Sequence, residues 1–414
     1  MLGLSKLKRN LAVFLAVAGP GIITAAVDND AGGITTYSIA GAHFGFSTLW
    51  LLAPIGILLI ITQEMGARLG IVTGKGLSDL IRENFGVRLT VALMAGLFLT
   101  NWANAVAEFA GIAAASQLLG MNAFIAVPLS GAIVWALVVK SNYKTVEKAF
   151  LIAIVFYVAY AIAAVMAQPD WGHALQQTIV PTLAFTPGYL LALVAIIGAT
   201  VAPWMQFYVQ ASVVEKGIRV KEMVYARIDV VAGSIVTILV MFFIIVTCAT
   251  VLHPRGITID SAWDAAQALA PFAGEHASAL FAFGLLAASL FAAAILPLAT
   301  AFTVCESFGW ESGVNKKFEE APQFYGLFAF LIASSALIVL VPGLPLMTVM
   351  YLSQALNGVF LPVILVLLLL LINKKALMGR HVNGPYYNAF VWLVAAAVSV
   401  MSVVLVLQPI LGIM

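Results

Sequence analysis

Charge is the scarcest property of this 414-residue sequence. Only 9% of its residues are charged, whereas soluble domains carry roughly 25%. Hydrophobic residues make up 63%, and the mean hydropathy is +1.07. This composition predicts an integral membrane protein. The net charge is only +2, so no nucleic-acid partner is expected.

Cysteine and histidine are also rare. Cys248 and Cys305 both lie inside apolar stretches and form neither a disulfide framework nor a zinc-binding spacing, so we interpret them as small buried side chains. The five histidines all map to the ends of apolar stretches or to the segments between them. The sequence therefore predicts a membrane interior without imidazole groups.

Long apolar stretches, by contrast, are abundant. Eleven are long enough to cross a bilayer as helices, and they lie near 12–41, 46–67, 89–119, 122–139, 149–167, 187–214, 229–252, 277–308, 323–341, 346–372 and 386–407. The predicted fold class is an all-α membrane protein with 11 transmembrane helices. No sizeable soluble domain is expected, so residues 1–414 are predicted to form a single transmembrane domain.

The basic residues predict the orientation of these helices. If the N-terminus is cytoplasmic, 19 of the 20 lysines and arginines fall on the cytoplasmic side, and only Arg255 falls outside. An even number of helices would break this alternation. We therefore expect a multi-pass protein with an extracellular or periplasmic C-terminus, and the short loops fit a prokaryotic inner membrane.

Two of the predicted helices are interrupted. The first contains "VDNDAGG" (27–33), and the sixth contains "IIGATVAPWMQF" (196–207), in which a proline follows small residues. Because proline and paired glycines disfavour a continuous helix, both segments should unwind near the middle of the bilayer. These helices begin two successive sets of five. That arrangement predicts an inverted repeat, with repeat 1 near 12–167, repeat 2 near 187–372 and an extra helix near 386–407.

Three acidic residues are predicted to lie deep in the membrane: Asp28, Asp30 and Glu108. A carboxylate at that depth costs about 2.5 to 3.5 kcal/mol, which makes it a candidate functional residue. Gln354 and Asn357 on the tenth helix add amide oxygens, although a buried glutamine such as Gln354 is more often a packing residue than a ligand. An interior rich in oxygen favours a hard divalent cation such as Mg²⁺, Ca²⁺ or Mn²⁺.

Five motifs together resemble the NRAMP family of metal-ion transporters. They are "GPG" (19–21), "TQEMGARLGIVTGKGLSDLIRENFG" (62–86), "AEFAGIAAASQLLG" (107–120), "GATVAPW" (198–204) and "SQALNGVFLP" (353–362). The resemblance covers essentially the whole chain in order. It implies a LeuT-like fold and transport of transition metals, chiefly Mn²⁺ and Fe²⁺, and not an enzymatic activity.

The resemblance also implies metal ligands. The family's first-helix Asp-Pro-Gly-Asn reads Asp30-Ala31-Gly32-Gly33 here, so Asp30 is the expected metal-binding carboxylate and Gly33 replaces an asparagine ligand. The sixth-helix Met-Pro-His reads Ala202-Pro203-Trp204, so a sulfur ligand and a histidine are both missing. The remaining implied ligands are the carbonyl groups of Val27 and Ala199 and the side chain of Gln354.

These departures favour magnesium. Without a methionine sulfur the site loses the soft ligand that favours Mn²⁺ or Fe²⁺, and Gly33 and Ala202 are expected to enlarge the cavity. Mg²⁺ prefers oxygen ligands and usually keeps several waters. The sequence thus resembles the NRAMP-related magnesium transporters. We predict uptake of partly hydrated Mg²⁺, and also of Mn²⁺, by alternating access.

Proton coupling is not expected. A proton relay needs titratable groups in sequence, but Trp204 and Ala105 occupy two positions that are titratable in the family. Glu108 could be a remnant of that relay or a hydrogen-bonded packing residue. The predicted mechanism is therefore uniport, and the alternative is an ordinary proton-coupled Mn²⁺/Fe²⁺ transporter.

Several other residues are expected near the ion without binding it directly. Asp28 has no family counterpart, and its role is left open between the vestibule and direct coordination. The residues of this predicted outer shell or vestibule are Asp28, Asn29, Thr200, Trp204, Asn357 and Glu108. An intramembrane hydrolase is disfavoured, because both aspartates come from one short stretch. The expected partners are a divalent ion as substrate and the lipid bilayer, with no cofactor and no obligate protein partner.

Overall fold

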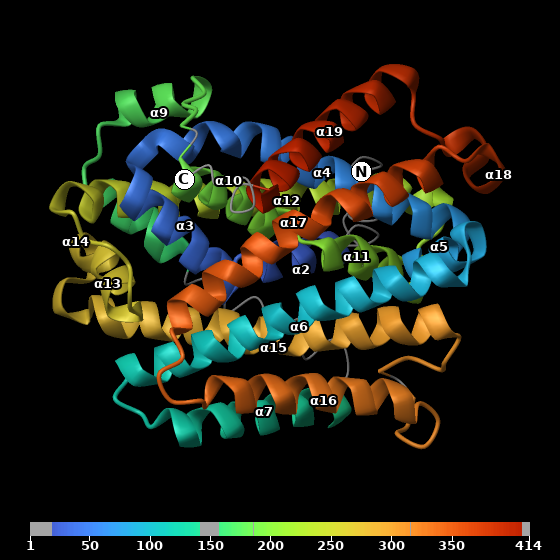
Figure 1. Ribbon diagram of the computed structural model, residues 1–414, viewed down its shortest axis with the longest axis horizontal. Helices are drawn as coiled ribbons and strands as arrows, with labels where there is room; N and C mark the ends of the chain where they lie inside the picture. Colours follow the sequence, from blue (N-terminus) through green and yellow to red (C-terminus); the bar gives the residue numbers. More distant parts are fainter. Residues whose placement is uncertain (1–18, 141–156, 185, 315, 408–414) are drawn as a thin grey trace, which may run out of the picture.

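The computed structural model describes residues 19–140, 157–184, 186–314 and 316–407, and in this part of the chain all regular structure is helical (Figure 1). The helices of the first half are α2 (Pro20–Val27), α3 (Ala31–Phe44), α4 (Leu52–Thr73), α5 (Leu77–Phe85), α6 (Val87–Leu118), α7 (Ala123–Lys140), the helix Tyr157–Met166 and α9 (Trp171–Ile179). Those of the second half are α10 (Pro187–Thr200), α11 (Pro203–Glu215), α12 (Met223–Val251), α13 (Ala262–Ala266), α14 (Ala270–Ala273), α15 (Ala277–Phe308), α16 (Pro322–Val339), α17 (Leu346–Ile372), α18 (Lys375–Met378) and α19 (Pro385–Leu407).

The predicted all-α membrane fold is confirmed. Eight helical stretches among the described residues are long and apolar enough to cross a membrane, and two shorter apolar helices accompany them. One of the eight, Ala31–Thr73, joins two predicted spans through a short 3-10 helix, Gly45–Leu51. The predicted ranges 12–41 and 149–167 lie partly outside the described residues. The number of eleven spans therefore stays a prediction, as do the orientation and the repeat boundaries.

Both predicted helix breaks are present. The first helix ends at Val27 and resumes at Ala31, and the sixth ends at Thr200 and resumes at Pro203. In the sixth helix, proline occupies the first position of α11, where its missing N–H costs nothing. The sequence therefore identified both breaks and, in the sixth helix, the proline at which the second half-helix begins, whereas Gly32 and Gly33 lie inside α3.

Close packing of α10 against α17 joins two helices of the second half of the chain. A Cβ atom on Gly198 would collide with the backbone carbonyl of Gln354, and one on Gly358 would collide with the backbone carbonyl of Val194. Only glycine permits helix backbones to approach this closely. This contact places the end of α10 beside the middle of α17. Elsewhere α6 and α15 run side by side, with α7 and α16 on their outer side (Figure 1).

The half-helix α2 is held by α12. The carboxylate of Asp229 on α12 accepts hydrogen bonds from the backbone N–H groups of Gly19 (3.1 Å) and Gly21 (2.6 Å). Asp229 is buried, so it supplies acceptors to donors that a helix N-terminus otherwise leaves unsatisfied. Gly21 also lies against the backbone of α12, because a Cβ atom there would come within 2.7 Å of Val230.

Candidate functional site

Asp30 stands at the start of α3, directly after the first break. Its backbone is extended, and its carboxylate oxygen Oδ1 accepts a hydrogen bond of 2.7 Å from the N–H of Gly33. The side chain is buried. Asp30 is therefore the N-cap of α3, and its carboxylate lies at the positive end of that half-helix.

Glu108 of α6 meets Asp30 at the same helix end. Its Oε2 atom accepts a hydrogen bond of 3.3 Å from the N–H of Ala31, which places its carboxyl group next to that of Asp30. In a continuous helix the N–H of Ala31 would donate to the carbonyl of Val27. Glu108 therefore takes away the donor that would otherwise occupy the Val27 carbonyl, which is one of the predicted ligands.

The second break frees a carbonyl in a different way. In a continuous helix the carbonyl of Ala199 would accept a hydrogen bond from residue 203, but residue 203 is a proline and has no N–H group. Ala202 adopts an extended backbone, and both alanines are buried. Val27 and Ala199 thus occupy equivalent positions, four residues before the point where each half-helix resumes.

A short hydrogen-bonded bridge links the two breaks. The hydroxyl groups of Tyr37 on α3 and Thr200 on α10 are 3.1 Å apart. Tyr157 in turn donates a hydrogen bond of 2.8 Å to the carbonyl of Asn29 in the first break. Sequence reasoning missed both tyrosines. The spacing from Asp30 to Tyr37 is seven residues, or about two helical turns on one face, and could have indicated the first of them.

Asp28 lies in the unwound segment, between the half-helices. Its side chain is buried, and Thr237 of α12 is the one described side chain that is close enough to donate a hydrogen bond to it. A single hydroxyl cannot satisfy two carboxylate oxygens, and a buried carboxylate in that situation calls for a cation or for water. Asp28 is thus inside the protein, next to the break.

Gly33 does not open the space that the sequence predicts. A Cβ atom at this position would lie 2.5 Å from the backbone carbonyl oxygen of Asp28. The expectation of a larger cavity on this side is therefore wrong for the conformation seen here, because the unwound backbone folds over the first turn of α3. A main-chain oxygen lies where the family's asparagine side chain would project.

Three amides of α6 and α17 form a buried network. Asn357 donates to Oε1 of Gln354 (3.0 Å) and to Oδ1 of Asn104 (3.1 Å), and Asn104 donates to Oδ1 of Asn357 (2.9 Å). The amide nitrogen of Gln354 packs against Gly32, where a Cβ atom would collide with it. Gln354 thus reaches the first break as predicted, but its oxygen is turned toward Asn357. Binding a metal through that oxygen requires rotation of the amide group.

Trp204 and Gln206 lie on α11, just beyond the second break. The indole of Trp204 is buried against Tyr208, with ring centroids 5.9 Å apart. The side-chain amide of Gln206 lies against the carbonyl groups of Ala202 (3.0 Å) and Pro203 (2.8 Å). Trp204 thus fills its position by packing, and sequence reasoning missed Gln206.

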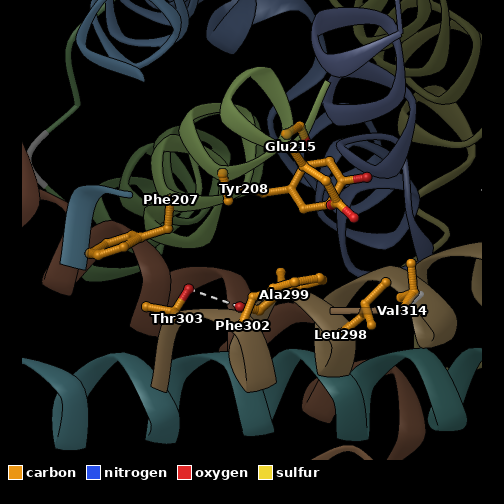
Figure 2. Close-up of a pocket in the computed structure, with 10 residues that line it drawn as sticks. Phe207, Tyr208, Glu215, Leu298, Ala299, Phe302, Thr303 and Val314 are labelled. Atoms are coloured by element: carbon orange, nitrogen blue, oxygen red, sulfur yellow. Dashed lines mark hydrogen bonds between the residues drawn. The ribbon is translucent and has the colours of Figure 1, made fainter. Parts of the chain in front are cut away.

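A small cavity of about 20 Å³ lies between α11 and α15. In Figure 2, Phe207 and Tyr208 of α11 face Ala299, Phe302 and Thr303 of α15 across it. Its lining begins one helical turn after Pro203 and includes Glu215 at the end of α11. The cavity therefore extends from the second break toward the end of α11.

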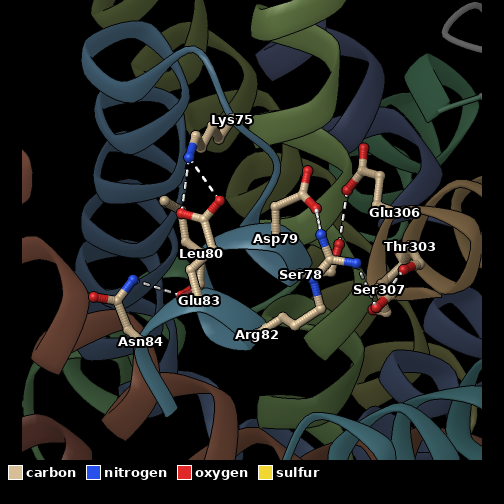
Figure 3. A network of polar contacts seen from close by, with 10 residues as sticks. All are labelled: Lys75, Ser78, Asp79, Leu80, Arg82, Glu83, Asn84, Thr303, Glu306 and Ser307. Atoms are coloured by element: carbon tan, nitrogen blue, oxygen red, sulfur yellow. Dashed lines mark hydrogen bonds and ion pairs between the residues drawn. The ribbon is translucent and has the colours of Figure 1, made fainter. Parts of the chain in front are cut away.

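The helix α5 is tied to the end of α15 by polar contacts (Figure 3). Ser78 donates a hydrogen bond of 2.7 Å to Glu306, and Arg82 contacts both the carbonyl of Ser307 (3.2 Å) and the carboxylate of Asp79 (3.3 Å). Burial raises the pKa of the Asp79 carboxyl above its usual range, and the neighbouring guanidinium of Arg82 opposes that change. These contacts fix the connection between α4 and α6 on this end of the bundle.

No group of three or more histidine, cysteine, aspartate or glutamate side chains that could hold a metal occurs among the described residues. The groups that meet at the breaks are instead one or two carboxylates, backbone carbonyls and an amide. Such oxygen donors suit a hard divalent cation that keeps part of its water.

Comparison with protein families identifies the fold and the relatives of this chain. The family model for natural resistance-associated macrophage protein-like (Nramp) proteins matches residues 21–408. A divalent metal cation transporter, MntH, of Deinococcus radiodurans is 29% identical over 94% of this chain and 89% of its own length. The Bacillus subtilis protein of the same name is 24% identical over 97% and 93%.

Solved structures show the same architecture. The manganese transporter of Eremococcus coleocola, crystallised with an aromatic bis-isothiourea compound, superimposes with a TM-score of 0.80 at 22% identity, covering 94% of this chain and 86% of that one. The nucleobase-cation-symport-1 transporter Mhp1 in a closed conformation gives 0.57 at 15% identity, covering 94% and 91%. The predicted fold is therefore shared with these two transporters.

Proposed function

This chain belongs to the Nramp family, and from that premise we propose that it carries divalent metal ions across the membrane at the two helix breaks, with Mg²⁺ as its main substrate. Mn²⁺ is a second substrate, because it accepts the same oxygen ligands. Transport proceeds by alternating access, in which the half-helices move around the bound ion.

The observation that carries this proposal is the chemistry of the groups at the breaks. Asp30 provides a carboxylate at the start of α3, and the carbonyls of Val27 and Ala199 lack their usual helical donors. Position 202, where the family has a methionine, carries only a methyl group in a buried, extended backbone. Oxygen without sulfur favours Mg²⁺ over softer ions.

The close approach at Gly33 supports the same ion. The Asp28 carbonyl lies where an asparagine side chain would otherwise project, so the site replaces one oxygen by another. The second carboxylate, Asp28, is buried next to the break. Its negative charge lies close enough to attract a cation that still carries part of its water shell.

Uniport is the proposed mechanism. Trp204 packs against Tyr208 and offers no titratable group, and Ala105 is a buried alanine. The membrane potential alone supplies about 4.6 kcal/mol per 100 mV for a divalent cation that enters a negative interior. Ion entry is therefore favourable without protons.

A proton-coupled Mn²⁺ transporter is the second candidate. It is favoured by the contact between the carboxyl groups of Glu108 and Asp30, because metal binding to Asp30 would displace a proton that the pair shares. The two candidates differ in one measurable quantity, which is the number of protons moved with each metal ion.

Reconstituted protein in proteoliposomes tests both candidates. Uptake of Mg²⁺, Mn²⁺ and Ca²⁺ is measured with and without an imposed pH gradient, while a fluorescent dye reports the internal pH. We expect Mg²⁺ uptake that follows the membrane potential and leaves the internal pH unchanged. Failure to carry Mg²⁺ would overturn the magnesium assignment, and acidification in proportion to uptake would overturn uniport. The variant Asp30→Asn serves as the inactive control.

A further inference from the structure

A second polar site lies on the flank of the helix bundle, away from the helix breaks. It is an open cleft of about 680 Å³ between α4, α12 and the start of α19. Its lining consists of Ile60, Ile61, Glu64, Arg68, Arg227, Asn383, Gly384 and Tyr387. We refer to these residues as the flank cleft. The proposed transport function does not use any of them.

The polar wall of the flank cleft is built around one carboxylate and two guanidinium groups. Glu64 bonds Arg68 through one oxygen (3.1 Å) and the Nε of Arg227 through the other (2.8 Å). Arg68 is almost fully buried and also donates to Asn383 (2.5 Å) and to the carbonyl of His381 (2.9 Å). Two positive charges face one negative charge, so the wall keeps a net positive charge.

Arg227 is the group that can bind a ligand. Its side chain is 48% exposed, and only its Nε bonds a residue that the structure describes. The two terminal nitrogens are therefore available and are held in a fixed direction by Glu64. A guanidinium in this state presents a fork of donors that matches the oxygens of a phosphate group.

The other wall of the flank cleft is apolar. On α4, Ile60 and Ile61 lie one helical turn before Glu64 and two turns before Arg68. They extend the cleft from the polar end of α4 toward the middle of that span. A ligand that fits both walls has an anionic head and a hydrocarbon tail, whereas free phosphate uses only the first wall.

We propose that the flank cleft binds an anionic phospholipid, with its phosphate on the terminal nitrogens of Arg227 and its acyl chain along Ile60 and Ile61. Basic pockets between transmembrane helices are suited to lipid headgroups in this way. The phosphate chemistry is shared with free phosphate ions, but the apolar wall favours the lipid.

Native mass spectrometry of the full-length protein in detergent tests this site. The protein is incubated with phosphatidylglycerol and phosphatidylcholine in equal amounts, and the lipids that stay bound are counted. We expect selective retention of phosphatidylglycerol. The variant Arg227→Gln should lower that retention roughly tenfold, and Arg227→Lys should restore part of it. Equal retention by the wild type and Arg227→Gln would refute the proposal.

Two controls separate the alternatives. Arg219→Gln makes the same charge change at an exposed arginine outside the flank cleft, so it should bind lipid like the wild type; an equal loss would mean that only net charge matters and would overturn the site. Millimolar inorganic phosphate should not displace phosphatidylglycerol, and displacement would overturn the lipid assignment. Unchanged gel-filtration profiles and metal uptake show that each variant is folded.

Discussion

The two helix breaks differ in their side chains. The first break consists of residues 28–30, and two of these three are aspartates. The second consists of Val201 and Ala202, whose side chains have no polar atoms. Both breaks release one backbone carbonyl. At the second, the release is built into the chain by Pro203, and at the first it depends on Glu108 from another helix. The first break therefore supplies the charged groups of the candidate ion site, and the second supplies a backbone oxygen and small apolar side chains.

The largest effect on ion uptake is expected when the charge of the first break is removed. Asp30→Asn keeps an N-cap residue at the start of α3 but removes the carboxylate. We expect Mg²⁺ uptake to fall by more than the roughly 10- to 100-fold that is typical when a residue outside the ligand shell of a metal is lost. Uptake into proteoliposomes measures this. Activity within tenfold of the wild type would mean that the first break is not the charged half of the site.

The next largest effect on uptake is expected when a side-chain atom is added at Gly33 in the first turn after the first break. Gly33→Ala puts a Cβ atom 2.5 Å from the carbonyl oxygen of Asp28, so the unwound segment must shift, at a cost of roughly 1 to 3 kcal/mol. We expect uptake to fall about tenfold. Gly326→Ala is the matched control, because a Cβ atom there meets nothing within 4 Å. Equal behaviour of the two variants would contradict the close contact at Gly33.

At the second break, a soft ligand should change selectivity. Ala202→Met restores a thioether at a position where the side chain is now a methyl group, and we expect the preference for Mn²⁺ over Mg²⁺ to rise several-fold, by about 1 kcal/mol. Competition between the two ions during uptake measures the ratio. Ala202→Leu adds similar bulk without sulfur and should lower uptake of both ions equally. A shift of the same size in Ala202→Leu would show that bulk, and not sulfur, is responsible.

Substitution of Asp28 tests whether its carboxylate binds the ion directly or only attracts it. If Asp28 attracts the hydrated ion without binding it, Asp28→Asn should weaken uptake only about threefold, and high salt should reduce the difference. The dependence of the uptake rate on Mg²⁺ concentration, measured at two ionic strengths, gives the answer. A loss as large as that of Asp30→Asn would instead make Asp28 a direct ligand.

The smallest effect is expected at Glu108. Glu108→Gln removes the carboxylate but keeps an amide oxygen that can accept the hydrogen bond from the N–H of Ala31. We expect uptake within about twofold of the wild type and no change with external pH between 6 and 8. A strong pH dependence that disappears in this variant would support the proton-coupled alternative.

The sequence predicts the breaks well because their causes are local. Pro203 acts on its own backbone at the second break. The first break falls at residues 28–30, just before Gly32 and Gly33, which lie inside α3. Both interruptions and the helical class of the fold therefore follow from a single pass along the chain. Asn357 stays a predicted outer-shell residue, and its hydrogen bonds with Asn104 of α6 are a contact that the sequence did not predict. Periodicity and helix-breaking residues thus carry most of the architecture.

The remaining features of the site depend on contacts between distant segments. No local pattern indicates that the Asp28 carbonyl covers Gly33, or that Tyr157 holds the carbonyl of Asn29. The space expected at Gly33 was therefore wrong, because a missing side chain was counted as empty volume although the backbone moved into it. Contacts of this kind depend on how the unwound segment packs, which residue spacing does not encode.

The hydrogen bonds from Gly19 and Gly21 to Asp229 have a consequence for the biogenesis of the protein. The donors and the acceptor are separated by 210 and 208 residues in the chain. At a synthesis rate of roughly 5 to 20 residues per second, the start of α2 waits about 10 to 40 seconds for its partner to be made. These two hydrogen bonds can therefore form only after the start of α12 has been synthesised.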